Sequence, residues 1–62
     1  TSNGRILFTM PDKQNCLFEI LKSGKTKQIS DSVSSVGFDK YSGSVIYFET
    51  DKKGGTVCKI IT

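Results

Sequence analysis

The segment VIYFETDKKGGTVCKII, residues 45–61, predicts a β-hairpin and with it the class of the fold. Residues 45–50 and 56–62 are rich in β-branched and aromatic side chains, which favour strands. Between them lie Asp51, two lysines and two glycines, and glycine permits the positive φ angles that tight hairpin turns need. The segment therefore predicts two antiparallel strands joined by a short turn.

Four more runs of the same kind precede this hairpin. Strands are predicted over residues 5–10, 16–21, 25–30 and 33–38, with turns at 11–15, 22–25, 31–32 and 39–43. The one stretch with helical spacing, residues 16–23, is too short to form a stable helix. Short connections favour sequential antiparallel pairing. We therefore expect a single all-β domain over residues 1–62, an antiparallel meander of five or six short strands that forms a small barrel or a two-layer sandwich.

Strand alternation also predicts a core. Residues two apart in a strand share a face, and we expect the more apolar face of each strand to be buried. The predicted core consists of Ile6, Phe8, Cys16, Phe18, Ile20, Val36, Phe38, Val45, Tyr47, Cys58 and Ile60. Because Tyr47 and Phe48 are adjacent, they point to opposite faces. Either one of them lies outside the main core, or that strand is covered on both sides.

Length and composition exclude several classes of function. A domain of 62 residues, 35% of them hydrophobic, buries only about 60% of its unfolded surface and leaves little chain for a cleft. The absence of histidine excludes imidazole catalysis and histidine metal sites. Gly24-Lys25-Thr26 has Glu19 where a phosphate-binding loop needs its earlier glycine. No apolar run reaches the roughly 18 residues of a membrane span. We predict no enzyme activity, no cofactor and no metal.

Cys16 and Cys58 are the only two cysteines. They either form one disulfide or are both buried thiols. In the chain-entropy model, a bridge closing about 43 residues stabilises a fold by roughly 4 kcal/mol, which is comparable with the whole stability of so small a domain. We expect the disulfide and a secreted protein, whereas free cysteines would indicate the cytoplasm.

The chain is basic, with nine lysines and arginines, six acids and a net charge of +3. Such a charge can attract nucleic acid or acidic protein, although the interspersed acids favour an ordinary solvated surface. The polar strand at 25–30 suits a sheet edge open to β-augmentation. Predicted binding residues lie at this edge and in two loops: Lys22, Lys25, Lys27, Tyr41, Lys52 and Lys53.

Elimination leaves a small non-catalytic protein that binds another protein, in the manner of a secreted effector, toxin or inhibitor. The alternative is a basic nucleic-acid-binding β-barrel. For that role the sequence supplies charge but no recognisable motif of exposed aromatic residues.

The first and last thirds of the chain resemble each other. Residues 6–8 match residues 45–47 at an offset of 39, and after one inserted residue 17–21 match 57–61 at an offset of 40. Any two β-hairpins share such features, because strands draw on few residue types. A period of about 40 residues built on four strands resembles a β-propeller blade of the TolB or YWTD kind, although no Tyr-Trp-Thr-Asp tetrapeptide is present. One and a half blades cannot close a propeller, so this resemblance implies a fragment or a ring of several copies.

The segment CLFEIL at 16–21, the turn at Gly24 and a second cysteine about forty residues after the first carry another resemblance. They are similar to the small secreted fungal effectors of the MAX type, six-stranded β-sandwiches pinned by one disulfide. Only four residues follow Cys58, fewer than a final hairpin needs. This resemblance implies an effector that acts on host proteins.

Overall fold

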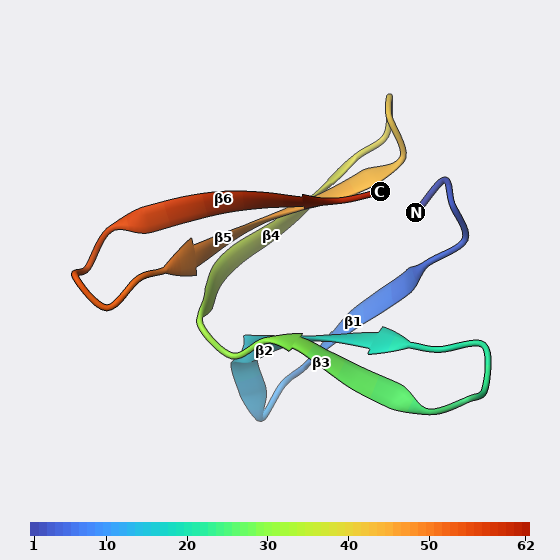
Figure 1. Ribbon diagram of the computed structural model, residues 1–62, viewed down its shortest axis with the longest axis horizontal. Coiled ribbons are helices and arrows are strands. Elements are labelled where there is room, and N and C mark those ends of the chain that lie inside the picture. The colour runs from blue at the N-terminus through green and yellow to red at the C-terminus, as the bar shows by residue number, and fades with distance from the viewer.

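Six β-strands and no helices make up the computed structural model, which describes residues 1–62. The strands are β1 (Ile6–Met10), β2 (Lys13–Ile20), β3 (Thr26–Ser30), β4 (Val33–Asp39), β5 (Ser44–Thr50) and β6 (Thr56–Ile61). They form two antiparallel sheets in the orders β1-β2-β3 and β4-β5-β6. The predicted all-β antiparallel fold is confirmed, as two three-stranded sheets (Figure 1).

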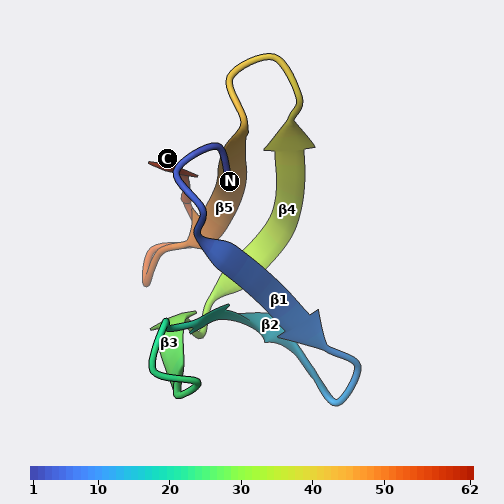
Figure 2. The same cartoon turned by 90° about the vertical axis from the view of Figure 1, so that its right-hand side faces the viewer.

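The two sheets lie as separate layers inclined to each other (Figures 1 and 2). Residues 31–32 connect β3 to β4 without any pairing between these strands, so the meander is interrupted at its centre. The sheets approach each other chiefly through β2 and β4. Each sheet is therefore held together by its own ladder, and side-chain packing holds one sheet against the other.

Two turns of the same design close the β2–β3 and β5–β6 hairpins, at residues 21–25 and 51–55. In each, the first N–H donates to the fifth carbonyl and the fourth N–H donates to the first carbonyl, at 2.8–3.1 Å. The fourth residue, Gly24 or Gly54, has a φ of 87° or 79°, a left-handed conformation that glycine adopts without steric cost. These predicted turns are confirmed. The β1–β2 turn is shorter than predicted, because β2 already begins at Lys13.

The core is one small cluster made by both sheets. Its buried side chains are Leu17 from β2, Val33 from β4, Tyr47 from β5 and Ile61 from β6. Leu7, Ile29 and Val45 pack against it and are partly buried. We call the face of each sheet that carries this cluster the inner face, and the opposite one the outer face. Only eight of the 62 residues are buried, so most of each sheet is open to solvent.

The predicted core is wrong for several strands. Phe18 and Tyr47 are buried as predicted. The exposed residues that had been predicted as core are Ile6, Ile20, Val36, Phe38, Cys58 and Ile60. In β6 the core residue is Ile61, which is 6% exposed, and not the predicted Ile60, which is 62% exposed. In β1 and β6 alternation could not make this choice, because both faces carry large apolar side chains. In β4 it chose the inner face, since Val36 pairs with Tyr47 and Phe38 with Val45, but both residues stay exposed because the sheets diverge there.

Strand pairing also changes the offset at which the first and last thirds of the chain correspond. Ile6 pairs with Ile20 in the first sheet, and Ile46 pairs with Ile60 in the second. Over residues 6–8 and 18–20 the pairing of β1 with β2 therefore matches that of β5 with β6 at an offset of 40 residues, whereas toward the turn the two hairpins differ, since Met10 pairs with Lys13 and Thr50 with Thr56. At this offset the outer face of each sheet presents isoleucines at equivalent positions.

Candidate interaction surface

Most strand residues that carry charge lie on the inner faces, whereas Asp39, which pairs with Ser44 at the end of β4, lies on the outer side of its sheet. Directly paired residues project to the same side of a sheet, and Glu19 pairs with Leu7, a neighbour of the core. In the second sheet Lys59 pairs with the buried Tyr47, and Glu49 lies two residues further along β5 on the same face. This placement is the reverse of an ordinary sandwich, whose outward positions are polar.

Glu19 is held by Arg5 in a two-pronged ion pair. Arg5 Nε donates to Oε2 at 2.9 Å, and the terminal Nη2 donates to Oε1 at 2.7 Å. These bonds keep the pKa of Glu19 below its ordinary value and raise the pKa of Arg5. Glu19 is buried, and a bidentate guanidinium satisfies both of its oxygens. The carboxylate of Glu19 is therefore neutralised by Arg5 at the inner face of the first sheet.

Glu49 connects both sheets near the other end of the core. Lys59 Nζ lies 2.8 Å from Oε1, and the Ser30 hydroxyl donates to Oε2. Bonds from Lys59 and then Ser30 lower the pKa of Glu49. Ser30 belongs to β3 and Glu49 to β5, so the cluster ties one sheet to the other. Both strand glutamates are therefore committed to contacts within the fold.

The outer face of the β1–β3 sheet, which we call face A, carries no charge in its two central rows. Its paired rows are Ile6, Ile20 and Thr26, followed by Phe8, Phe18 and Gln28. The rings of Phe8 and Phe18 stack with their centroids 5.4 Å apart. Phe18 is only 8% exposed although its face points away from the other sheet, and Phe8 is half-buried.

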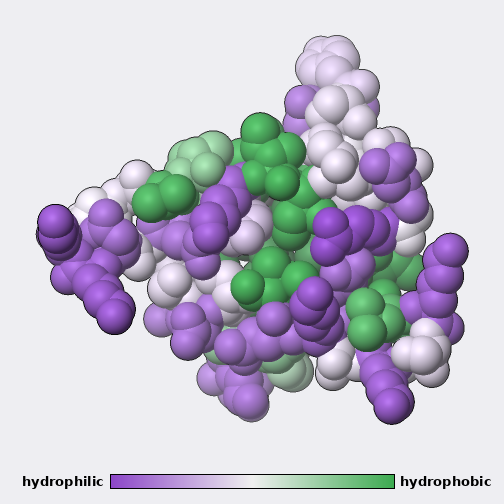
Figure 3. Space-filling view, in the orientation of Figure 1, coloured by the Kyte–Doolittle hydropathy of each residue, from purple (hydrophilic) through white to green (hydrophobic).

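The outer face of the β4–β6 sheet, face B, is also uncharged in its central rows. These rows are Gly37, Ile46 and Ile60, followed by Ser35, Phe48 and Cys58. β4 contributes only the small residues Ser35 and Gly37 to these rows, and no atom lies within 4 Å of the place where a Cβ on Gly37 would stand. Figure 3 shows apolar side chains reaching the surface among polar ones. Each sheet thus presents an open, neutral, largely apolar outer face.

The residues predicted to bind partners do not form one surface. They occupy separate parts of the fold (Figure 1): Lys22 and Lys25 in the β2–β3 turn, Lys27 in β3, Tyr41 in the β4–β5 loop, and Lys52 and Lys53 in the β5–β6 turn. β3 is an edge strand, as predicted. Tyr41 is 92% exposed, with Lys40 Nζ 5.8 Å from its ring centroid. Each group is a small local patch.

The predicted disulfide between Cys16 and Cys58 is not formed, and both cysteines are free. They belong to different sheets. Cys58 pairs with Phe48 and therefore projects from face B, away from the core. A sulfur atom on an outer face cannot reach a partner in the other sheet within the short Cβ separation that a disulfide requires.

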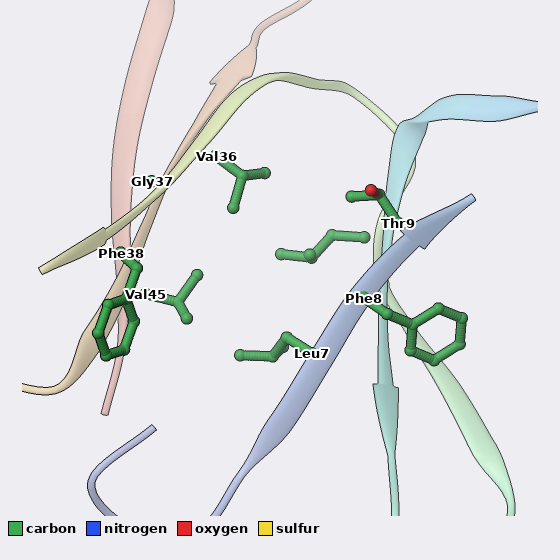
Figure 4. A pocket seen from close by; sticks show the side chains of 8 residues that line it. Leu7, Phe8, Thr9, Val36, Gly37, Phe38 and Val45 are labelled. Atoms are coloured by element: carbon green, nitrogen blue, oxygen red, sulfur yellow. The ribbon is translucent and has the colours of Figure 1, made fainter. Parts of the chain in front are cut away.

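A cavity of about 310 Å³ opens between the sheets along β1 and β4. Figure 4 shows Leu7, Val36 and Val45 projecting into it, whereas the ring of Phe8 points away. The core residue Leu17 also lines it. None of its eight lining residues carries an acid or a base. The cavity is a wedge left by the inclination of the sheets, and it offers apolar contact alone.

Sequence reasoning missed faces A and B as surfaces, although one signal pointed to them. The adjacent residues Tyr47 and Phe48 implied that β5 has apolar side chains on both sides. Isoleucine and phenylalanine on the outer faces were interpreted as core because apolar strand residues are usually buried.

Comparison with known proteins finds no matching family, no similar curated protein and no similar solved structure. The structure contains no helix long and apolar enough to cross a bilayer. The case for a function therefore rests on the two outer faces.

Proposed function

We propose that this chain is a non-catalytic protein-binding module and that faces A and B are its contact surfaces. The observation that carries the proposal is the inverted placement of charge. Glu19, Glu49 and Lys59 lie on inner faces, whereas Ile6 and Ile60 are exposed on outer ones. Contiguous exposed apolar surface marks interaction sites in soluble proteins, and interface cores are depleted of charge.

A nucleic-acid role has less support. Nucleic-acid surfaces interleave basic residues with exposed aromatic rings. The lysines of the turns lie at separate corners (Figure 1), and the rows that contain Phe8, Phe18 and Phe48 hold no lysine or arginine. Binding of a protein through the neutral outer faces accounts for the exposed apolar residues, whereas attraction of nucleic acid by dispersed lysines does not.

A capture experiment with matched variants tests the proposal. Tagged wild type, Ile6→Lys on face A, Ile60→Lys on face B and the turn variant Lys22→Glu/Lys25→Glu are exposed to the same extract. Wild type and the turn variant should retain the same proteins, and each face variant should lose at least fivefold of the signal. Equal capture by all four proteins would overturn the proposal. Loss with the turn variant alone would move the site to the lysines.

A further inference from the structure

We propose that the free edge of β1 is a docking site for one further β-strand, which runs antiparallel to β1 and leads directly into the turn at residues 1–5. β1 is an edge strand, with β2 on one side only. The N–H and C=O groups on the free side of an edge strand can pair with an added strand. This site is separate from faces A and B, so it does not rest on the proposed function.

Residues 1–5 form the same hairpin turn that closes the β2–β3 and β5–β6 hairpins. The Thr1 nitrogen donates to the Arg5 carbonyl at 2.6 Å, and the Gly4 N–H donates to the Thr1 carbonyl at 2.9 Å. Gly4 has a φ of 81°, as positive as that of the glycine at the same place in each of the other two turns. Those turns each join two antiparallel strands, so this geometry specifies a strand opposite β1 and its direction.

The backbone of β1 is oriented to receive this strand. In an antiparallel sheet, successive residues direct their N–H and C=O groups alternately to the two neighbouring strands. The Arg5 carbonyl bonds to Thr1 on the free side, so the N–H and C=O of Leu7, two residues further on, point to the same side. Those of Ile6 and Phe8 point to β2, with which both residues pair. A ladder that starts at Thr1 and Arg5 would therefore continue at Leu7.

The side chains beside this edge also favour an added strand. The cavity of about 310 Å³ lies between β1 and β4 (Figure 4). Val36 and Phe38 line it from the inner face of β4 and are still exposed, Phe38 by 63%. With Thr1 opposite Arg5, the second residue before Thr1 would pair with Leu7 and share its inner face. An apolar side chain at that place would fill the cavity and cover Val36 and Phe38.

The second sheet contains the strand that the first one lacks. β1 corresponds to β5 in the pairing of the two hairpins, and β5 has β4 on the side where β1 has no neighbour. The turn at residues 1–5 is bonded to the loop that follows β4, since the Ser2 N–H donates to the Gly43 carbonyl at 2.8 Å. A strand leading into this turn would therefore run alongside β4 across the cavity and take the equivalent place in the first sheet.

A grafted strand tests the proposal. The β4 sequence VSSVGFD, residues 33–39, is placed directly before Thr1, where its phenylalanine and its second valine fall on the inner face. The control graft VSSGVDF has the same composition and turns both side chains to the outer face. The first graft should raise Tm by about 10 °C or more and slow hydrogen exchange of the Leu7 amide at least about tenfold. The control graft should leave both close to wild type, and far-UV circular dichroism verifies folding.

Several results would overturn the inference. In wild type the Leu7 amide should exchange faster than those of Ile6 and Phe8, and equal protection of all three would show that the edge is not free. Equal effects of the two grafts, or no effect of the first, would also contradict the site. Protection of Leu7 by free VSSVGFD peptide at equimolar concentration would make the occupant a separate chain, contrary to the proposal. Should a graft prevent folding, the shorter pair VGFD and GVDF replaces it.

Discussion

The adjacent isoleucines of β6 allow the choice of inner face to be tested with one chemical change at two positions. Ile61 is 6% exposed and belongs to the core cluster, whereas Ile60 is 62% exposed on face B. Replacing either by alanine removes the same atoms and costs the same strand propensity. Any difference between the two variants in the free energy of unfolding therefore reports burial.

The magnitudes follow from the buried area. Truncation of isoleucine to alanine removes three carbon atoms, worth about 0.8 kcal/mol each when fully buried. Ile61→Ala should thus cost about 2.5 kcal/mol, near the lower end of the range for core truncations. Ile60→Ala should cost less than about 1 kcal/mol. A chain of this length has only about 3–9 kcal/mol of stability in total, so the first change is severe.

Urea denaturation followed by far-UV circular dichroism at low micromolar concentration measures both variants as monomers. The corresponding loss in Tm is about 10–20 °C for Ile61→Ala and under about 8 °C for Ile60→Ala. Equal losses, or a larger loss for Ile60→Ala, would refute the assignment of inner and outer faces. In that case the face chosen from alternation would be the core.

Three further predictions concern acid stability, the turns and the thiols. The pKa of Glu49 is lowered in the folded state by Lys59, so its contribution is present above the unfolded value of about 4.3 and is lost as pH falls through the folded value. Thermal melts between pH 7 and 3 should show a shallower decline for Glu49→Gln than for wild type, and parallel curves would contradict this. Gly54→Ala should lower the free energy of unfolding by about 1 kcal/mol, because Gly54 has a φ of 79°. Gly37→Ala is the control and should cost less than half as much. Equal costs would show that the turn does not require the left-handed conformation. Ellman's reagent should titrate two thiols in unreduced protein, with the exposed Cys58 reacting before the half-buried Cys16, and no free thiol would restore the predicted disulfide and with it the case for secretion.

The strands and turns were predictable from sequence because their signals are local. Residues 51–55 combine an aspartate, lysines and glycines between two β-rich runs, and the structure forms the expected hairpin there. The interruption between β3 and β4 was less visible, because a short connection such as 31–32 also permits pairing. Of the two expected forms, a small barrel and a two-layer sandwich, the structure has the two separate sheets of the second.

The inner face was not predictable for a physical reason. Alternation identifies which residues share a side, but it selects the buried side only when the other side is polar. In β1 and β6 both sides carry large apolar residues, as Leu7 beside Phe8 and Ile60 beside Ile61 illustrate. The ion pairs that mark the inner face, such as Arg5 with Glu19, depend on cross-strand register. The same ambiguity conceals the candidate surface, since an outer face with core-like composition is indistinguishable from a core in sequence.

The most direct test of the central claim, that the neutral outer faces are the contact surfaces, is a ¹⁵N–¹H NMR titration of the labelled chain with a protein that it retains in the capture experiment. We predict that amide signals of Phe8, Ile20, Phe48 and Ile60 shift or broaden as the partner is added, while those of the lysine turns at 22–25 and 51–55 stay fixed. Changes confined to the turns would contradict it.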